Sequence, residues 1–313
     1  MTAKIDFFGE ELNSYKANLH THSTTSDGSY PIQEVVNLYR AEGYDILAAT
    51  DHRITNKVSE IDAGGLLLIS GMEIHPVGPR GILLHLVALN VPEDFENPSD
   101  LPYQEAIDRV IEAGGKCILA HPYWSGFNSN DIMQLKNLIA IEVYNTSTRY
   151  IGKAYNMAIW DNILQLGYQL PAIAVDDTHR TPDFFRGWTM ICARENTAAA
   201  IMEALQKGSF YASQGPVIRR IDFKDHIFSI ECSPCQELIV MGDCSFGQCG
   251  IVPDFETADI KKLKKGEAKE MASYTVEIPD NAGLTYIRCQ LKDRAGNYAW
   301  SAPINLKRDG SGE

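Results

Sequence analysis

The chain has 313 residues, of which 44% are hydrophobic, so it can bury a full-sized core as one large domain or as a large and a small one. Its formal net charge of −13 argues against binding to long nucleic acid, which requires a basic surface. A small anionic substrate remains compatible with this charge, because metal ions in a cleft can reverse the local field.

The N-terminal residues lack the features of an export signal. Met1–Asn13 has no basic start followed by an apolar core, and no apolar stretch of the chain approaches the length of a membrane span. We therefore expect a cytoplasmic protein without a membrane partner, whose seven cysteines are reduced thiols. No pattern in the sequence indicates an oligomeric state.

Short apolar runs alternate with helical patterns from residue 16 to about residue 176. Continuous apolar runs are typical of strands covered on both faces, as in parallel α/β sheets and barrels. The predicted strands are Lys16–Leu19, Ile46–Thr50, Leu66–Ser70, Leu83–Leu89, Cys117–Ala120, Ile139–Tyr144 and Ala172–Val175. Helices are predicted from Pro31 to near Gly43, from Pro102 to Gly114, and over Asp131–Leu138, Ile151–Leu166 and Thr197–Lys207.

Seven strands in this order predict an α/β fold, a closed or nearly closed (β/α) barrel. Only the third and fourth strands are joined without a helical pattern, through Pro76–Gly81. In such barrels the chemistry lies at the carboxyl ends of the strands. Polar motifs follow six of the predicted strands, and His85 lies within the remaining one, which favours a functional site at one barrel mouth.

The pattern changes after Gln214-Gly215-Pro216. Short alternating runs separated by turns predict a small antiparallel β-sandwich from residue 217 to 308. The runs are Ile227–Glu231, Glu237–Met241, Tyr274–Ile278, Thr285–Leu291 and Ala302–Leu306. We read residues 1–216 as the barrel domain and Asp309–Glu313 as a disordered tail. The basic run Lys261–Lys265 reads as a solvated loop.

Most of the eight histidines stand in short motifs or close to them. The motifs are His20-Thr21-His22, Thr50-Asp51-His52, Ala120-His121-Pro122 and Asp176-Asp177-Thr178-His179, with Asp27, Glu73 and His85 between them. Imidazole and carboxylate without thiolate suit several divalent metals, among them zinc, manganese, iron and nickel. The motifs therefore predict a metal-dependent enzyme.

At these residues the chain resembles the PHP (polymerase and histidinol phosphatase) family of metallohydrolases. The His-x-His start, Ser26-Asp27-Gly28, Thr50-Asp51-His52, Gly71-x-Glu73, Ala120-His121-Pro122 and Asp177-x-His179 match in order, over roughly Tyr15 to His179. The resemblance implies a distorted seven-stranded barrel that holds two or three divalent ions. The segments from Gly187 to Pro216 and from Asp293 to Pro303 look like the CehA/McbA-like branch. Asp176 departs from the pattern of many members and is left without a role.

The resemblance also implies how the ligands divide. His20, His22, Glu73 and Asp177 would hold one ion; Glu73 would bridge to a second, held also by His85 and His121; Asp27, His52 and His179 would hold a third. A carboxylate is a natural bridge, because its two oxygens can each reach a different cation. Asp51 is better read as a residue that orients an imidazole or caps a turn. Two ions with an empty or exchanging third site remain the alternative.

Further residues have a functional and a structural interpretation. His75, Arg149, Arg180 and Tyr123 are predicted substrate contacts, since guanidinium suits phosphate and an aromatic ring can stack on a planar group, but each can equally be a loop or rim residue. Trp124 and Tyr144 are further aromatic candidates. Cys232-x-x-Cys235 with Cys244 and Cys249 superficially suggests a zinc site, although buried thiols fit the strand pattern better.

The favoured function is a metal-dependent phosphoesterase. Glu73, Asp177 and His179 are the predicted catalytic residues, and a metal-bridging hydroxide would attack a small phosphate ester, a nucleotide or a short oligonucleotide. The cofactors would be two to three zinc, manganese or iron ions. The alternative is a carboxylic or carbamate ester hydrolase that uses the same site. A non-catalytic binding module is disfavoured by the intact ligand set.

Overall fold

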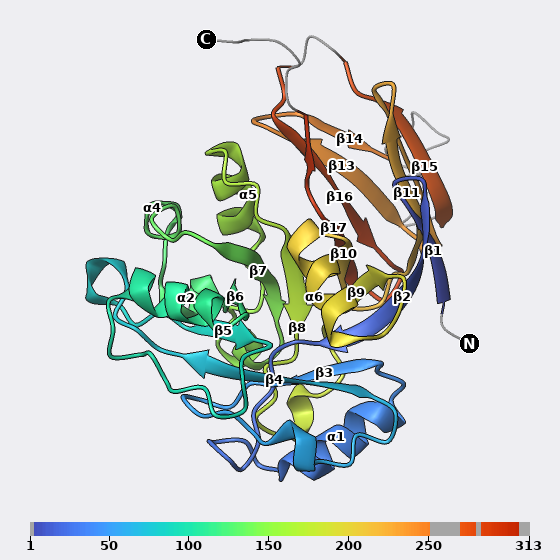
Figure 1. Cartoon of the computed structure of the whole chain (residues 1–313). Coiled ribbons are helices and arrows are strands. Elements are labelled where there is room, and N and C mark those ends of the chain that lie inside the picture. Colours follow the sequence, from blue (N-terminus) through green and yellow to red (C-terminus); the bar gives the residue numbers. More distant parts are fainter. Residues whose placement is uncertain (1–2, 251–269, 280–282, 307–313) are drawn as a thin grey trace.

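The computed structural model describes residues 3–250, 270–279 and 283–306. The predicted basic loop Lys261–Lys265 and the predicted tail Asp309–Glu313 lie outside these residues. The described part is a mixed α/β structure with one extensive sheet (Figure 1). None of its helices is long and apolar enough to cross a bilayer.

Seven strands pair in the order in which they follow one another along the chain. They are β2 (Glu10–Asn18), β3 (Ile46–Ala49), β4 (Leu67–Ile74), β5 (Leu86–Leu89), β6 (Lys116–Leu119), β7 (Leu138–Asn145) and β8 (Ala172–Val175). Each overlaps one of the predicted strands. Past the ends of β8 and β2, the Asp177 N–H donates to the His20 carbonyl (3.0 Å) and the His22 N–H to the Thr178 carbonyl (3.1 Å). The first and last members of the series are therefore hydrogen-bonded where the polar motifs lie.

Strand β5 runs antiparallel to both of its neighbours, unlike the other strands of this series. A parallel connection needs a long crossover, usually a helix, and the link from β4 contains only the short 3₁₀ turn η2 (Pro79–Gly81). Leu86, the first residue of β5, pairs with Ile74 and Leu119, the last residues of β4 and β6. His85 therefore lies just before the amino end of its strand, beside the carboxyl ends of β4 and β6.

Six helices lie among the described residues, and the longer ones pack their apolar sides against these strands (Figure 1). They are α1 (Ile32–Ala41), α2 (Tyr103–Glu112), α3 (Pro122–Ser125), α4 (Ser129–Ile132), α5 (Met157–Gln165) and α6 (Ala198–Lys207), with 3₁₀ turns η1 (Val58–Glu60), η3 (Ser147–Ile151) and η4 (Thr181–Asp183). The helix predicted over Asp131–Leu138 is wrong. Asn128 caps α4, which ends at Ile132, and Asn137 takes a left-handed φ of 64° just before β7. The helix predicted from Ile151 begins only at Met157.

Three strands that no prediction covered join the two parts of the chain. β1 (Ala3–Phe7) forms a hairpin with β2, β9 (Trp188–Ala193) pairs with β2, and β10 (Phe210–Ser213) pairs with β9. β1 then pairs with β11 (Ile218–Lys224) and β10 with β17 (Tyr298–Ser301). The sheet therefore continues without interruption past the expected boundary at residue 216.

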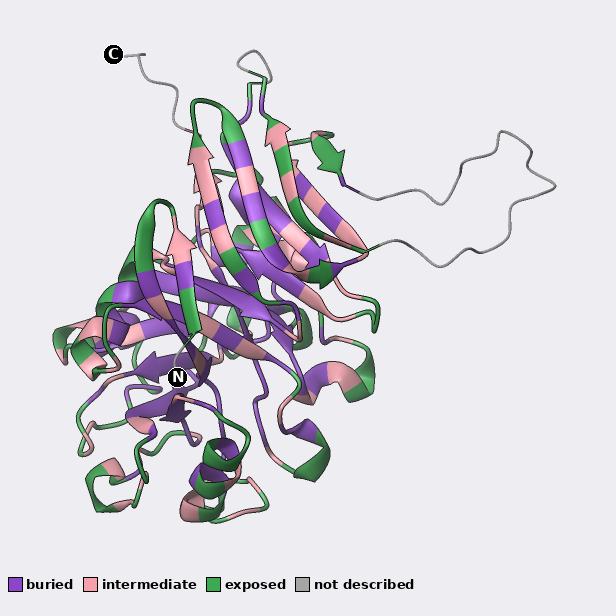
Figure 2. Ribbon diagram, turned by 90° about the vertical axis from the view of Figure 1, so that its right-hand side faces the viewer, coloured by how far each residue is buried: buried purple, intermediate pink, exposed green. Residues whose placement is uncertain are grey.

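The C-terminal strands form two antiparallel sets around a shared apolar core. One set is β11, β12 (Ile227–Cys235) and β15 (Met271–Glu277); the other is β13 (Glu237–Gly242), β14 (Gly247–Cys249), β16 (Tyr286–Lys292), β17 and β18 (Ile304–Asn305). Figure 2 shows buried and more exposed residues alternating along these strands, as expected when one face is covered. The core also takes in Ile5, Leu12 and Tyr211 from the first part of the chain.

The cysteines of this region do not form a metal site in the described structure. Cys232 and Cys235 are buried free thiols, as the strand pattern indicated, whereas Cys244 and Cys249 are exposed. Among the described residues, no group of potential metal ligands includes a cysteine. The apolar core therefore explains the burial of Cys232 and Cys235.

Candidate metal centre

The predicted ligands converge at one end of the β2–β8 series. All nine, together with His75, fall in groups whose ligand atoms lie within 4.8 Å of one another. His20 and His22 follow β2, His52 follows β3, His121 follows β6, and Asp177 and His179 follow β8. Glu73 is the last residue but one of β4, which extends four residues beyond its predicted end.

The first group is fully buried. The Nε2 atoms of His20 and His22 lie 3.1 Å apart, and they lie 3.3 and 3.0 Å from Oδ1 of Asp177. Both also lie 3.5 Å from Oε2 of Glu73. Ligand atoms that bind one tetrahedral ion at about 2.1 Å lie roughly 3.4 Å apart, so these separations fit a shared cation.

Glu73 connects this group to a second one. Its Oε1 lies 2.8 Å from Nδ1 of His85 and 3.4 Å from Nε2 of His121, while Oε2 lies 2.6 Å from Nδ1 of His52 and 3.5 Å from Nε2 of both His20 and His22. The side chain has no solvent exposure. The two oxygens therefore point to different sets of imidazoles, which is the arrangement that a bridging carboxylate requires.

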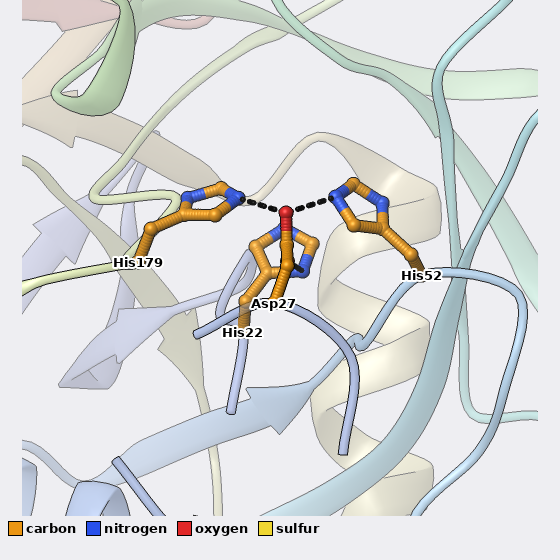
Figure 3. A group of neighbouring side chains, drawn as sticks. All are labelled: His22, Asp27, His52 and His179. Carbon is orange, nitrogen blue, oxygen red and sulfur yellow. Dashed lines mark ion pairs between the residues drawn. The ribbon is translucent and has the colours of Figure 1, made fainter. Parts of the chain in front are cut away.

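The third group lies closer to solvent. Figure 3 shows the Asp27 carboxylate between the rings of His52 and His179, whose Nε2 atoms lie 3.4 and 3.5 Å from Oδ2. His22 also belongs to this group, because its Nδ1 lies 3.8 Å from Oδ1 of Asp27. The Asp27 side chain is 54% exposed, against 0% for His22. This group is therefore the most open of the three.

The electrostatics of the centre keep its buried carboxylates ionised. Burial opposes ionisation of Glu73, but the imidazoles around it, His20 foremost, hold the pKa of its carboxyl well below the usual range. The pKa of Asp177 is lowered in the same way by His20 and His22. Burial lowers the pKa of His22 itself, which favours the neutral imidazole that binds metal. Burial is the largest single effect on His52 and His179 and lowers the pKa of each, but Asp27, together with Glu73 or Asp177, outweighs it and raises the pKa of His52 to about 10 and that of His179 to about 9.

Several buried polar atoms of the centre make no hydrogen bond with acceptable angles within the described residues, although imidazole nitrogens lie as close as 2.6 Å to them. They include Oε2 of Glu73, Oδ1 of Asp177 and Nδ1 of His22. An unsatisfied buried polar atom costs about 1–3 kcal/mol, so a cluster of them calls for another partner. The groups together contain seven imidazoles and three carboxylates, which are ligand types that zinc, manganese and iron bind. The residues present therefore fit bound divalent ions.

Two ligands occupy strained backbone conformations. His121 has a φ of 24° and Asp177 a φ of 51°, values that non-glycine residues seldom adopt. Backbone strain of this kind persists where the surrounding structure enforces it and is concentrated at functional sites. Here the His121 N–H donates to Glu142 (2.8 Å), and the Asp177 N–H donates to the His20 carbonyl.

Glu142 was not identified from the sequence. It is fully buried on β7, and its carboxylate lies 2.6 Å from Nδ1 of His20. The signal that could have found it is a lone acidic residue inside the apolar run Ile139–Tyr144, since buried carboxylates are rare without partners.

Asp51 acts on a loop rather than on an imidazole. Its Oδ1 accepts from the backbone N–H groups of Ser23 (2.8 Å) and Ser26 (3.1 Å), and Oδ2 accepts from Asn56 (2.6 Å). It therefore fixes the turn that carries Asp27.

The structure also gives a role to Asp176, which no motif explained. Its carboxylate accepts from the N–H groups of Phe185 (2.7 Å), Arg186 (2.8 Å) and Gly187 (3.0 Å), and from the Tyr39 hydroxyl (2.8 Å). Burial raises its pKa to about 6, against the opposing effect of these hydrogen bonds. Asp176 therefore fastens the connection between β8 and β9.

A cavity of about 300 Å³ lies over the centre. Seven of the ligands line it, and its other walls are Trp124, Ser147, Thr148, Tyr150, Ile151 and Arg180. Among the predicted substrate contacts, Arg180 is therefore part of the wall. His75 lies behind the ligands, with Nε2 3.0 Å from Nδ1 of His52 and Nδ1 accepting from Arg53 (3.1 Å).

Arg149 and Tyr123 lie outside the residues that line this cavity. The Arg149 guanidinium donates to the carbonyls of Thr146 (3.0 Å) and Pro182 (2.7 Å) and to Asp183 (3.2 Å). Tyr123 is 46% exposed. The aromatic residue that lines the cavity is instead the neighbouring Trp124, whose ring lies edge-on to that of His121 with centroids 5.0 Å apart.

Comparison with known proteins finds partial relatives in sequence and a similar fold among solved structures. No family model matches the chain. It is 33% identical over 108 residues to a 5'-3' exoribonuclease from Haemophilus influenzae, an alignment that spans 32% of this chain and 39% of that protein. It is 26% identical over 139 residues to the DNA polymerase/3'-5' exonuclease PolX from Bacillus subtilis, spanning 36% of this chain and 24% of that protein. The chain thus matches less than half the length of either relative.

One solved structure resembles the whole chain. It is a two-domain protein from Bacteroides vulgatus that contains a predicted PHP-like metal-dependent phosphoesterase, with 18% sequence identity and a TM-score of 0.53, and the match covers 94% of this chain and 96% of that one. The two proteins therefore share a fold.

Proposed function

We propose that the chain is a metal-dependent phosphoesterase with a distorted seven-stranded barrel of the PHP type, in the CehA/McbA-like branch. The observation that carries the proposal is the convergence of Glu73 and Asp177, with their unsatisfied buried oxygens, on the imidazoles that surround them. The fold shared with the Bacteroides vulgatus protein supports the family assignment. We place the boundary between the barrel and the C-terminal strands at residues 216 and 217.

The ligands would hold two to three divalent ions in the three groups described above. Such ions supply positive charge for the phosphoryl oxygens and activate water for attack. The protein's own contribution is to hold Glu73 and Asp177 ionised and buried, and to keep the imidazoles of the first group in fixed positions. His179, at the open third group, is the ligand closest to Arg180 in sequence and lines the same cavity.

We propose Arg180 as the contact for a substrate anion. Its guanidinium stacks on the Tyr150 ring (4.4 Å), and Arg149 stacks on the same ring (4.1 Å). Arg149 is held by Asp183 and two carbonyls, so it anchors the ring on which Arg180 rests. Arginine suits phosphate because its planar guanidinium can donate two parallel hydrogen bonds.

The cavity limits the size of the substrate. Its volume of about 300 Å³ lies at the lower end of the range for small-molecule sites. Trp124 and Tyr150 offer aromatic surface beside the ligands, which suits a planar group such as a nucleobase. The nuclease names of the two partial relatives agree with a small phosphate ester, a nucleotide or a short oligonucleotide as substrate.

A hydrolysis screen tests the proposal. Protein loaded separately with manganese, zinc and iron would be assayed on phosphate monoesters, nucleotides and short oligonucleotides, and beside them on carboxylic and carbamate esters. We expect phosphate release that a chelator abolishes and that Asp177→Asn reduces. Cleavage of carboxylic or carbamate esters without phosphate release would overturn the proposal in favour of that alternative chemistry.

A further inference from the structure

Glu142 is a buried carboxylate at the centre of the site that belongs to none of the potential metal-binding groups. Oε1 lies 2.6 Å from Nδ1 of His20. Oε2 accepts from the N–H of His121 (2.8 Å) and from Nδ2 of Asn145 (2.8 Å). Both oxygens are therefore occupied by donors of the surrounding protein, which leaves Glu142 to act on ligands rather than on an ion.

The contact with His20 determines which ring nitrogen carries the proton. A carboxylate only accepts hydrogen bonds, so Nδ1 of His20 must be protonated to bind Glu142. The lone pair of a neutral imidazole then lies on Nε2, the atom that faces Asp177 at 3.3 Å and Glu73 at 3.5 Å. Carboxylates that hold a histidine in this way fix its orientation and strengthen it as a ligand.

The same carboxylate reaches two other ligands. The bond to the N–H of His121 helps to hold that residue at its unfavourable φ of 24°. Asn145 donates from Nδ2 both to Glu142 and to Oδ2 of Asp177, at 2.8 and 3.1 Å. Glu142 thus connects ligands that follow three different strands.

We infer that Glu142 is a positioning residue of the metal centre, which fixes the His20 tautomer and ties the backbone of His121 and the side chain of Asp177 to one anchor. The inference rests on the proposed function only in so far as it requires the centre to bind metal.

The isosteric variant Glu142→Gln tests it sharply. All three partners of Glu142 are donors, and a glutamine amide offers one acceptor oxygen and one donor group. If the oxygen faces His20, the amide N–H₂ opposes the donors of His121 and Asn145. If it is flipped, the N–H₂ faces Nδ1 of His20 and favours the wrong tautomer. Neither orientation preserves the network.

The measurement is titration of metal-free protein with Co²⁺, followed by calorimetry and by the visible absorption of the bound ion. We expect Glu142→Gln to lower the affinity for the tightest ion by about 10- to 100-fold and to alter its spectrum. Asp161→Asn is the matched control. Asp161 pairs with the buried Arg288 (2.7 and 2.6 Å) and belongs to none of the groups of potential metal ligands. The control variant should lower the melting temperature without changing the Co²⁺ titration.

A second measurement uses the unaltered protein and holds even if the variant fails to fold. In zinc-loaded wild type, long-range ¹H–¹⁵N spectra should show a proton on Nδ1 of His20 and zinc on Nε2. Zinc on Nδ1, or an unchanged Co²⁺ titration in folded Glu142→Gln, would overturn the inference. Metal binding without phosphate release would overturn the proposed function alone, and a wild type that binds no divalent ion would overturn both.

Discussion

Glu73 occupies the most demanding position in the site, because it is fully buried and both of its oxygens face imidazoles. Glu73→Gln keeps the shape of the side chain but removes the negative charge that a bridge between cations requires. We expect activity to fall by about 100-fold or more and the bound metal to decrease, with the fold retained. Elemental analysis and steady-state kinetics check this.

The matched control for that variant is Glu93→Gln, since Glu93 accepts from the backbone and hydroxyl of Ser59 (both 2.7 Å) and is not among the ligand groups. It should leave metal content unchanged. Normal turnover with full metal content in Glu73→Gln would show that the bridge is assigned to the wrong residue.

His52 tests the third group. Its side chain is 24% exposed, and its partner Asp27 is 54% exposed, so an ion held there is the least enclosed of the three. We expect His52→Ala to retain two ions and to weaken catalysis far more than stability. Titrating metal against activity should show a final, weakly bound equivalent that switches on turnover in the wild type and is missing in the variant.

His226→Ala serves as the control, because this histidine lies in the turn between β11 and β12. It should titrate as the wild type does. Identical curves for His52→Ala and the wild type would mean that His52 does not hold a functional ion.

The candidate ligands could be picked out from the sequence because most of them stand in short motifs directly after an apolar run. The supporting residues were harder to identify, for a physical reason. Glu142 contacts His20, which is 122 residues away in the sequence, and Asp176 accepts from Phe185, which is 9 residues away. Such contacts exist only once the strands have paired. The same holds for Arg149, whose attachment to the Pro182 carbonyl depends on the path of a loop.

Among the elements, the connection from β8 to β9 depends most on a single side chain. Asp176→Ala would leave three backbone N–H groups, those of residues 185–187, without their acceptor inside the protein. We expect the free energy of unfolding to fall by about 3 kcal/mol or more. Tyr39→Phe removes one of the bonds to Asp176, together with the bonds of the same hydroxyl to Asn18 and Thr178, and should cost about 2 kcal/mol.

Urea denaturation of both variants and the wild type gives these values. A loss below that of Tyr39→Phe in the Asp176→Ala protein would show that solvent satisfies the loop and that Asp176 does not fasten it.

Apolar periodicity predicted where the strands and helices lie more reliably than it predicted the direction in which a strand runs or the residue at which an element ends. All seven strands of the β2–β8 series were located, but the reversed direction of β5 is set by the short link before it. The helix expected from Asp131 failed because the side chain of Asn128 caps α4 and the left-handed Asn137 precedes β7. β1, β9 and β10 were not among the predicted elements.

At the scale of the whole molecule, the sheet and one apolar core both cross the expected domain boundary. β1 pairs with β11 and β10 with β17, so two strands of the first part have partners beyond residue 217. Ile5, Leu12 and Tyr211 are at most 6% exposed because the C-terminal strands cover them. Arg288 of β16 is also buried and pairs with Asp161 of α5. The two parts therefore complete each other's hydrophobic surface.

This continuity predicts how a truncated chain behaves. A protein that ends at residue 216 would expose the unpaired edges of β1 and β10 together with the apolar side chains beneath them, a combination that promotes aggregation. We expect residues 1–216 alone to be poorly soluble, and co-expression with residues 217–313 as a separate chain to restore a soluble complex with wild-type metal affinity. Soluble yield, size-exclusion chromatography and Co²⁺ titration of both preparations measure this. A monomeric 1–216 fragment with wild-type metal affinity would show instead that the first part folds without the C-terminal strands, and that the shared core contributes little to holding the metal ligands in place.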